Sequence, residues 1–319
     1  MSQVTGAPTR VLPLQGPAQQ IELRRPLTAP EQLTRALWRA RGRAQGRLPE
    51  GALTRLGPIE VWRRQLALDR ARVARFHAVC AVRSRADRVP AAFLQTLFLA
   101  PMASVVLHRS YPFSPLGLVH LRQRFEQRRA VSLDERLDLR CWLAELRETS
   151  RGYESDCGLE LRSGAELVWS GSTTFLSRGA GARSGGTTRR TPAPPATGQD
   201  GEMITIEVPG DVGRRYARAS GDYNPHHLFT LTARLVGFRR PIAQGMWTLA
   251  RAIAELEATE PEVERVAVEG TFKRPVFMPG VMALRVGEAD SDHEGGRPFE
   301  VFNPRRGEPH LVGRVCYPR

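Results

Sequence analysis

The pattern of apolar and polar positions predicts the same order of strands and helices in two parts of the chain. Residues 59–82 ("IEVWRRQLALDRARVARFHAVCAV") alternate as a strand and continue as a short helix with Asp69 as its N-cap. Residues 202–222 ("EMITIEVPGDVGRRYARASGD") show the same strand and the same helix. Phe76 and Tyr216 occupy matching positions when the two segments are aligned. The pattern therefore predicts two copies of one structural unit.

A long apolar helix and several antiparallel strands complete each unit. Residues 89–109 ("VPAAFLQTLFLAPMASVVLHR") are apolar nearly all round, and residues 240–259 ("RPIAQGMWTLARAIAELEAT") carry an apolar stripe of helical period. A proline opens each of these predicted helices, and strand-like alternation follows each of them. A single buried helix must be covered by the sheet that follows it, so the expected fold class is α+β. Two such units in one chain are expected to pack as a pseudo-dimer.

A stretch rich in Gly, Ser, Thr and Pro separates the two units. Residues 178–201 contain almost nothing apolar and predict a flexible linker. The expected domains are an N-terminal unit at 56–177 and a C-terminal unit at 202–319. Residues 1–55 are expected to form an N-terminal extension, partly disordered, with a short helix and loop at 28–56 packed against the first unit.

Composition places the chain among globular proteins. Its 319 residues are 41% hydrophobic, which suits two domains of ordinary size. No run approaches the ~18–20 apolar residues of a membrane span, and the N-terminus lacks the pattern of a secretory signal. We therefore expect a cytoplasmic protein with reduced thiols, because its four cysteines are scattered and show no metal-ligand spacing (Cys80, Cys141, Cys157 and Cys316).

The net charge of +14 comes almost entirely from arginine, since Lys273 is the single lysine. Clustered arginine is typical of nucleic-acid binding. These arginines are spread along the chain without a known nucleic-acid-binding motif, which argues against such a partner. The charge suits an anionic small ligand or an acidic carrier protein.

The two units differ most between the short helix and the long one. With the short helices aligned, Val82 stands opposite Asp222. Pro90 comes eight residues after Val82, whereas Pro241 comes nineteen residues after Asp222. The added stretch begins within "ASGDYNPHH" (219–227), which holds the most ionisable residues of the repeat. A segment added to one copy of a scaffold is a candidate functional site.

Asp222 and His227 form a candidate acid/base pair on this loop. Gly221 permits a turn, Pro225 fixes the chain, and Asn224 can hold the turn through hydrogen bonds to nearby backbone. A carboxylate and an imidazole within reach of one water can move protons at neutral pH. The alternative is a polar turn whose histidines are exposed or satisfied locally.

Gly245 falls in the first turn of the second long helix, within "PIAQGM". Backbone N–H groups there are unpaired and lie at the positive end of the helix dipole. A glycine lets an oxygen approach this backbone closely, as an oxyanion hole for a thioester enolate requires. Close packing of the helix on the sheet is the alternative explanation.

Residues 216–246 ("YARASGDYNPHHLFTLTARLVGFRRPIAQGM") resemble the signature of MaoC-like (R)-specific enoyl-thioester hydratases of hotdog fold, also called 3-hydroxyacyl-thioester dehydratases. Residues 268–280 ("VEGTFKRPVFMPG") are similar to the strand that follows the helix in that family. The whole chain resembles the double-hotdog branch, whose N-terminal copy lacks the catalytic loop. The resemblance implies reversible addition of water to trans-2-enoyl thioesters, which gives (R)-3-hydroxyacyl thioesters.

The resemblance also implies the ligands and the residue roles. The substrate would be an acyl-CoA or acyl carrier protein thioester, with CoA or phosphopantetheine as part of the substrate and with no metal or other cofactor. Dimers of such chains are possible, and no membrane insertion is expected. The implied catalytic pair is Asp222 and His227, and the implied oxyanion donor is the backbone N–H of Gly245. Three further residues would orient the loop or bind substrate (Asn224, Ser220 and Met246).

Three positions depart from the family pattern. His226 stands where the family usually has an aliphatic residue, Phe229 where it often has an acid, and Gln244 where it often has histidine. His227 is favoured over His226 because it lies five residues after Asp222. A hotdog thioesterase and a non-catalytic acyl-binding partner subunit remain alternative functions.

Overall fold

The computed structural model describes residues 9–25, 31, 34–35, 38, 48–84, 87–179, 203–258, 264–289 and 296–318. The first unit contains β3 (Ile59–Ala67), α3 (Arg70–Cys80), α4 (Ala91–Thr96), α5 (Leu99–Val106), β4 (Val119–Gln127), β5 (Arg136–Thr149), β6 (Gly152–Ser163) and β7 (Glu166–Arg178). The second contains β8 (Met203–Val208), α6 (Val212–Ser220), the 3-10 helix η1 (Pro225–His227), α7 (Thr230–Leu235), α8 (Gly245–Glu257), β9 (Val266–Phe272), β10 (Gly280–Val286), β11 (Arg297–Phe302) and β12 (Pro309–Cys316). Within the described residues, no helix is long and apolar enough to cross a membrane.

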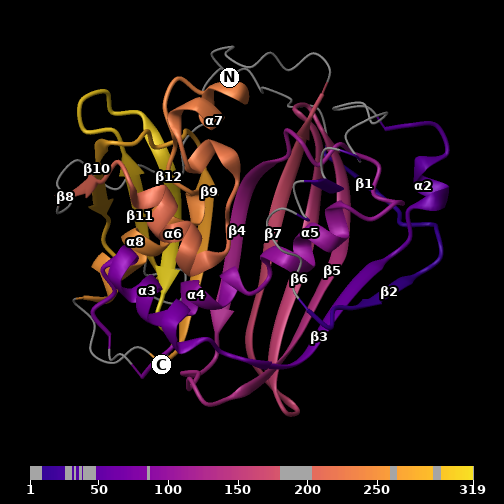
Figure 1. Cartoon of the computed structure of the whole chain (residues 1–319), viewed down its shortest axis with the longest axis horizontal. Helices are drawn as coiled ribbons and strands as arrows, with labels where there is room; N and C mark the ends of the chain where they lie inside the picture. Colours follow the sequence, from indigo (N-terminus) through magenta and orange to yellow (C-terminus); the bar gives the residue numbers. More distant parts are fainter. Residues whose placement is uncertain are drawn as a thin grey trace, which may run out of the picture.

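Both units contribute to one sheet, in the strand order β2-β3-β5-β6-β7-β4-β9-β12-β11-β10-β8, in which β2 (Gln19–Glu22) comes from the N-terminal extension. The order β3-β5-β6-β7-β4 of the first unit is repeated by β8-β10-β11-β12-β9 of the second. The units meet where β4 and β9 pair antiparallel, from Arg122 opposite Thr271 to Gln127 opposite Val266 (Figure 1). Two copies of one topology joined edge to edge confirm the predicted α+β pseudo-dimer, a double hotdog.

The two short helices match in detail. Asp69 caps α3 as predicted, because its side chain accepts from the second and third backbone N–H groups that follow it. The next residue after each helix is left-handed: Ala81 has a φ of 52° and Gly221 a φ of 88°. The aligned residues Phe76 and Tyr216 touch each other, with ring centroids 5.9 Å apart. The alignment of the two units made from the sequence is therefore confirmed at this point.

The long helix predicted at 89–109 is wrong for the first unit, because two shorter helices, α4 and α5, replace it. Pro101 is the third residue of α5. In an unbroken helix the nitrogen of Pro101 would face the carbonyl of Leu97, but proline has no N–H and its ring would clash with that carbonyl. Proline is tolerated in a first turn, so the chain ends α4 and begins a new helix just before it.

The long helix of the second unit is present, but it begins later than predicted. Pro241 does not open it; α8 begins at Gly245. The intervening residues pair with a neighbouring segment, since Ala243 N donates to Val276 O at 2.8 Å and Met278 N donates to Pro241 O at 2.9 Å. These backbone bonds hold the start of α8 in place.

The N-terminal extension contributes two strands to the sheet. β1 (Arg10–Leu12) pairs with β5, and β2 (Gln19–Glu22) runs parallel to β3. A short helix, α2 (Ala52–Arg55), lies within the stretch predicted to hold a helix and loop. Most of the remainder of that stretch lies outside the described residues, as does the predicted linker apart from its first two residues.

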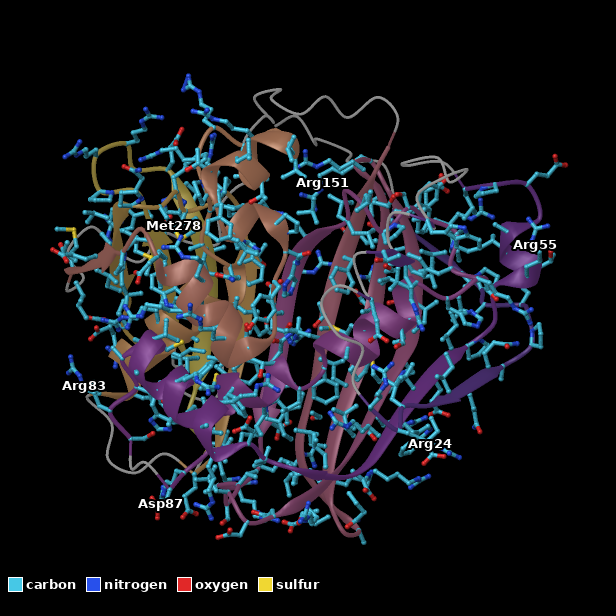
Figure 2. The ribbon with its side chains drawn as sticks, in the orientation of Figure 1. Arg24, Arg55, Arg83, Asp87, Arg151 and Met278 are labelled. Carbon is cyan, nitrogen blue, oxygen red and sulfur yellow. The ribbon has the colours of Figure 1, made fainter. Side chains whose placement is uncertain are left out.

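Arginine side chains of the first unit are largely paired with carboxylates. Arg140 pairs with Glu60, and Arg147 pairs with Asp156 at 2.7 Å. Figure 2 shows Arg24, Arg55 and Arg83 at the outer edges of the molecule. Other arginines of this unit also pair with acids (Arg70, Arg122, Arg124, Arg129, Arg151 and Arg162).

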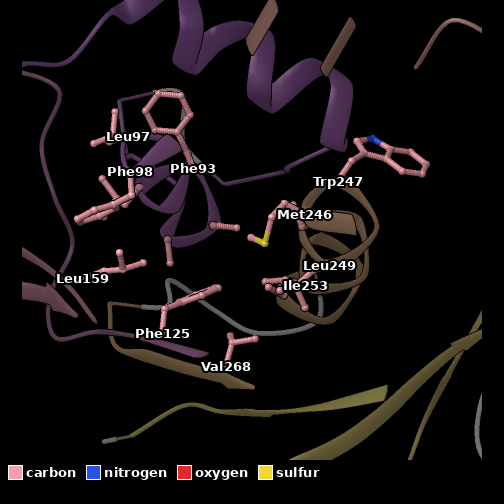
Figure 3. Packing of buried hydrophobic residues seen from close by; sticks show 14 of the residues in the cluster. Phe93, Leu97, Phe98, Phe125, Leu159, Met246, Trp247, Leu249, Ile253 and Val268 are labelled. Atoms are coloured by element: carbon pink, nitrogen blue, oxygen red, sulfur yellow. The ribbon is translucent and has the colours of Figure 1, made fainter. Parts of the chain in front are cut away.

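The apolar core is continuous across the two units. Phe125 of β4 lies directly opposite Val268 of β9, and both are buried (Figure 3). Trp247 of α8 crosses to the first unit, where its Nε1 donates to Val79 O at 2.9 Å. Burying an aromatic or aliphatic side chain of this size contributes roughly 1.5–3 kcal/mol. The two units are therefore stabilised as one body.

Candidate active site

Asp222 lies on a tight loop that begins where α6 ends. The left-handed Gly221 starts the turn, in a conformation that side chains rarely adopt. Ser220 Oγ donates to Tyr216 O and accepts from Asp222 N at 3.1 Å. Asn224 donates to Asp222 Oδ1 twice, from its backbone N at 3.3 Å and from Nδ2 at 2.8 Å. Asn224 thus bonds to the carboxylate itself, whereas the sequence predicted only bonds to nearby backbone.

His227 comes from η1 and faces Asp222. Pro225 is the first residue of η1, and His227 N donates to Asn224 O at 3.0 Å. His227 Nδ1 lies 2.7 Å from the carbonyl of Ile242, which can only accept, so this nitrogen carries the proton. The other nitrogen, Nε2, is bare in the neutral ring and lies 3.7 Å from Asp222 Oδ2. One oxygen atom placed between them would be within hydrogen-bond distance of both.

His226 lies beside this pair but faces differently. Its ring centroid is 4.0 Å from that of His227 and 5.7 Å from that of Phe238. Its backbone carbonyl accepts from Ile242 N at 3.1 Å. In the part of the chain that the structure describes, its ring does not come within ion-pairing distance of the Asp222 carboxylate. The His227 ring is thus the nearer of the two to the Asp222 carboxylate, and the charges of His226 and Asp222 also interact.

Burial shifts the pKa values of both members of the pair. Burial raises the pKa of Asp222, and the hydrogen bonds from Asn224 offset only part of that effect. Burial lowers the pKa of His227 to about 4 and the pKa of His226 to about 4. At neutral pH His227 is thus a neutral imidazole with a bare Nε2, beside a carboxyl group that holds its proton more readily than usual.

The N-terminus of α8 lies next to the loop. The first hydrogen bond of this helix runs from Thr248 N to Gln244 O at 3.1 Å, so the N–H groups of Gly245, Met246 and Trp247 precede the helical pattern. Gly245 keeps accessible surface, while the other residues from 241 to 250 are buried. An anionic oxygen is stabilised at such a position by unpaired N–H groups and by the helix dipole.

Gly245 is also tightly packed. A Cβ at this position would lie 3.0 Å from Cε1 of Phe272, closer than nearly all real contacts of this kind. Both explanations that the sequence offered for this glycine, close packing and an exposed backbone, are therefore compatible with its surroundings. Met246, predicted to orient the loop or bind substrate, lies in the apolar core (Figure 3).

Gln244 connects α8 to the loop. Its side chain is 1% exposed, and Nε2 donates to Gly213 O at 3.0 Å and to Asp222 O at 3.3 Å. Gly213 permits this close assembly, because a Cβ there would lie 2.0 Å from His227 O. Helix α6, helix α8 and η1 therefore hold one another in register.

His120 of β4 is a site residue that the sequence did not reveal. Its ring lies 4.7 Å from Phe272, the residue that packs against Gly245. Burial lowers the pKa of His120 to about 4, and the charge of Asp222 acts in the opposite direction, so the two groups lie in electrostatic range. Only the pairing of β4 with β9 brings His120 here, and a lone histidine on a strand gives no local signal of that contact.

A cavity is lined by described residues outside this loop, and the described residues hold no cluster that could bind a metal ion. A cavity of about 480 Å³ is lined by residues of β2, of the N-terminal extension and of the end of α5 (Ile21, Leu23, Arg35, Trp38, Ser104, Leu107, His108 and Arg109). None of the predicted site residues lines it. Among the described residues, no three His, Cys, Asp or Glu side chains gather as a metal site requires.

Comparisons with known proteins agree with the sequence motif and the fold. The family model for the MaoC like domain matches residues 193–297. The chain is 31% identical, over 251 residues, to 3-hydroxyacyl-thioester dehydratase X of Mycobacterium tuberculosis (strain ATCC 25618 / H37Rv). That match covers 79% of this chain and 86% of the relative. The chain belongs to the MaoC-like dehydratase family.

Solved structures of MaoC-like proteins share the architecture. The crystal structure of HtdX from M. tuberculosis matches with a TM-score of 0.66 and 29% identity, over 81% of this chain and 99% of that one. A MaoC-like dehydratase from Phytophthora capsici matches with a TM-score of 0.66 and 16% identity, over 82% and 95% of the two chains. A further M. tuberculosis protein, described as a double hotdog, matches with a TM-score of 0.51 and 13% identity, over 86% and 96%. The last two likenesses concern the fold alone.

Proposed function

We propose that this MaoC-like protein catalyses the reversible hydration of trans-2-enoyl thioesters to (R)-3-hydroxyacyl thioesters. The observation that carries the proposal is the bare Nε2 of His227 facing Oδ2 of Asp222 across 3.7 Å. The dehydratase name of the 31% identical relative supports the same reaction class. The acyl carrier is CoA or a carrier protein, and CoA or phosphopantetheine belongs to the substrate.

His227 acts as the base toward water. Its Nδ1 is held by Ile242 O, so Nε2 is the free acceptor at neutral pH. A water between Nε2 and Asp222 Oδ2 gives its proton to Nε2 while its oxygen bonds to C3 of the enoyl chain. The low pKa of His227 keeps the ring neutral and ready to accept, and a positioned base of this kind contributes roughly 10²–10⁴-fold to the rate.

Asp222 acts as the acid toward C2. Burial raises the pKa of Asp222, and Asn224 occupies Oδ1 with two N–H groups, so we assign the transferred proton to Oδ2. As the C3–O bond forms, the π electrons of the double bond move toward C2 and the thioester carbonyl, and C2 takes the proton from Oδ2. The proton on His227 then returns to Asp222. Because His227 Nε2 and Asp222 Oδ2 lie only 3.7 Å apart, both act on one face of the double bond in this mechanism.

The N-terminus of α8 stabilises the negative charge that develops on the thioester oxygen. We assign this role to the N–H of Gly245, since this residue keeps accessible surface at the unpaired start of the helix. Ser220 and Asn224 hold the loop, and Met246 shapes the apolar wall behind the glycine. Adding and removing water changes no oxidation state, and the proposed steps use only side chains and backbone N–H groups, without a metal or redox cofactor.

A spectrophotometric assay tests the proposal. Crotonyl-CoA and a longer trans-2-enoyl-CoA are followed by the loss of enoyl-thioester absorbance, with free thiol measured in parallel. Hydration without thiol release is expected. Thiol release would instead show a thioesterase. The absence of both reactions would refute the proposal and favour the alternative of a non-catalytic acyl-binding subunit.

Asp222→Asn adds a structural test to this assay. Asparagine keeps an acceptor for Asn224 and replaces only the oxygen that faces His227. The rate is expected to fall on the order of 10² or more. Asp211→Asn is the matched control, because Asp211 is an exposed carboxylate at the start of the same helix and makes no side-chain capping bond. Equal activity of both variants would show that Asp222 is not the acid.

A further inference from the structure

Helix α7 and its flanks expose an unusual amount of apolar surface. Ten large hydrophobic side chains are exposed among the described residues, and five of them lie within 223–236. Leu231 and Leu235 are 72% and 80% exposed, and they lie one helical turn apart on α7. Phe229 and Val236 flank them and are also more than half exposed. Exposed apolar surface of this kind on a structured helix is typical of a binding site.

This surface is fixed to the candidate active site. Thr232 Oγ1 donates to Pro225 O, the first residue of η1, at 2.6 Å. Arg214 of α6 donates to Leu228 O at 3.0 Å, and its guanidinium lies 5.3 Å from the ring centroid of Phe229. The exposed side chains therefore lie on an ordered extension of the loop that carries His227.

The same segment concentrates positive charge without compensation. Between Val212 and Arg240 the sequence contains six arginines and a single carboxylate, Asp222, whose side chain is 18% exposed (the arginines are Arg214, Arg215, Arg218, Arg234, Arg239 and Arg240). Five of these arginines are exposed. In the part of the chain that the structure describes, no carboxylate lies within ion-pairing distance of any of the six, in contrast to the paired arginines on the first unit's sheet. The segment that carries the candidate site thus has exposed arginines in excess of carboxylates, even with Asp211 at the start of α6 included.

We propose that this α7 surface, formed by Phe229, Leu231, Leu235 and Val236 with Arg234 and Arg239, docks an acidic protein that carries the acyl chain on a phosphopantetheine arm. The inference rests on the proposed function, and it names carrier-bound thioesters as the substrate that this site selects. The apolar side chains supply the contact area, and the arginines attract and orient an acidic surface.

Other occupants fit the surface less well. A second copy of this chain related by two-fold symmetry would bring the same arginines face to face, and like charges repel. Free CoA would use the arginines through its phosphates but would leave Leu231 and Leu235 uncovered. An anionic lipid surface would match both the charge and the apolar side chains, but α7 has only six residues, far fewer than most helices that lie in a membrane interface.

Kinetics with one acyl group on three carriers test the proposal. The trans-2-octenoyl group is presented on a bacterial acyl carrier protein, on CoA and on pantetheine. The double variant Arg234→Glu/Arg239→Glu is expected to raise KM for the carrier-protein thioester about tenfold or more and to leave kcat/KM for the pantetheine thioester unchanged. Leu231→Ser/Leu235→Ser is expected to act in the same direction. The matched control is Arg75→Glu/Arg136→Glu, which reverses two exposed arginines of the first unit and should leave all three substrates unaffected.

Three results would overturn the proposal. Equal losses with the CoA and carrier-protein thioesters would assign the arginines to the phosphates of CoA. A wild-type protein that uses the carrier-protein thioester no better than the pantetheine thioester would remove the reason for docking. Cosedimentation with phosphatidylserine vesicles that the Arg234→Glu/Arg239→Glu change abolishes, without any change in KM for the carrier, would assign the surface to membranes.

Failure of the proposed function is distinguishable from failure of docking. If the wild-type protein hydrates none of the three thioesters, the reaction is wrong. Calorimetric titration of Asp222→Asn protein with the loaded carrier protein then measures docking without turnover. Binding that the Arg234→Glu/Arg239→Glu change weakens about tenfold and that added salt also weakens supports the surface. Absence of binding overturns it.

Discussion

Replacing His227 by asparagine separates the two roles of its ring, which are the hydrogen bond from Nδ1 to Ile242 O and the proton acceptor at Nε2. The amide nitrogen of asparagine is as many bonds from the backbone as Nδ1 of histidine, so His227→Asn can keep the hydrogen bond to Ile242 O. It has no atom at the position of Nε2, which faces Asp222 at 3.7 Å. We expect kcat to fall roughly 10²–10⁴-fold, the contribution of a positioned base, with a loss of stability below about 1.5 kcal/mol.

His227→Gln gives the opposite combination. Glutamine reaches the position of Nε2 but has no donor at the position of Nδ1, which leaves the buried carbonyl of Ile242 without its partner. Such a loss costs about 1–3 kcal/mol, so this variant should be as inactive as His227→Asn but less stable in urea unfolding. His226→Asn is the control for the same change one residue away, and it should keep most of the activity.

The pH dependence of the wild-type rate completes this test. Because the pKa of His227 is about 4, kcat/KM should rise with pH through that region, and it should fall again above the raised pKa of Asp222, whose protonated form donates to C2 in the proposed mechanism. The hydration rate is measured by enoyl-thioester absorbance from pH 3.5 to 8, over the range in which the protein stays folded. A His227→Asn variant that keeps more than about a tenth of the wild-type kcat would refute the assignment of His227 as the base.

Three further changes probe the support of the site. Gly213→Ala should abolish activity and lower stability, since its Cβ would lie 2.0 Å from His227 O, whereas Gly210→Ala meets nothing closer than 3.6 Å and should be tolerated; activity and thermal unfolding compare the two. Gln244→Leu should cost about 1–3 kcal/mol in urea unfolding, because the carbonyls of Gly213 and Asp222 lose their buried donor; an unchanged stability would contradict this. The folded pKa of His227, about 4, lies below its unfolded value of about 6.5, so stability is lost as pH falls from about 6.5 through 4, by about 3 kcal/mol. His227→Asn should lose correspondingly less stability between pH 7 and pH 4, as measured by urea unfolding at both values.

Local sequence patterns were enough to predict the repeat and the loop. Alternating strands, the N-cap at Asp69 and the matched ends of the short helices are encoded within a few residues of each other, and all are present. The juxtaposition of Asp222 and His227 followed from their spacing around Pro225. Such features depend on turns and caps, which neighbouring residues determine.

Features that depend on packing escaped the sequence. Apolar periodicity predicted one helix across 89–109. This pattern takes no account of the missing N–H of Pro101, which cannot donate to the carbonyl of Leu97. His120 reaches the site through the pairing of two strands from different units. Gln244 was noted only as a departure from a family pattern, although its amide joins three elements of the site. Tertiary contacts of this kind produce no periodic pattern in the amino-acid sequence.

The asymmetry between the two units explains why the chain has one such loop. Arg72 of α3 donates to Ala219 O at 3.0 Å and to Ser220 O at 2.7 Å, at the end of α6 just before Asp222. When the two helices are aligned, Val212 of α6 corresponds to Arg72 of α3. The aliphatic side chain of Val212 cannot donate equivalent hydrogen bonds to the end of α3. Since α3 ends in a short connection without the added residues, it needs no such support. The first unit thus contributes Arg72 and His120 to its neighbour's site, and the loss of its own loop is compatible with that supporting role.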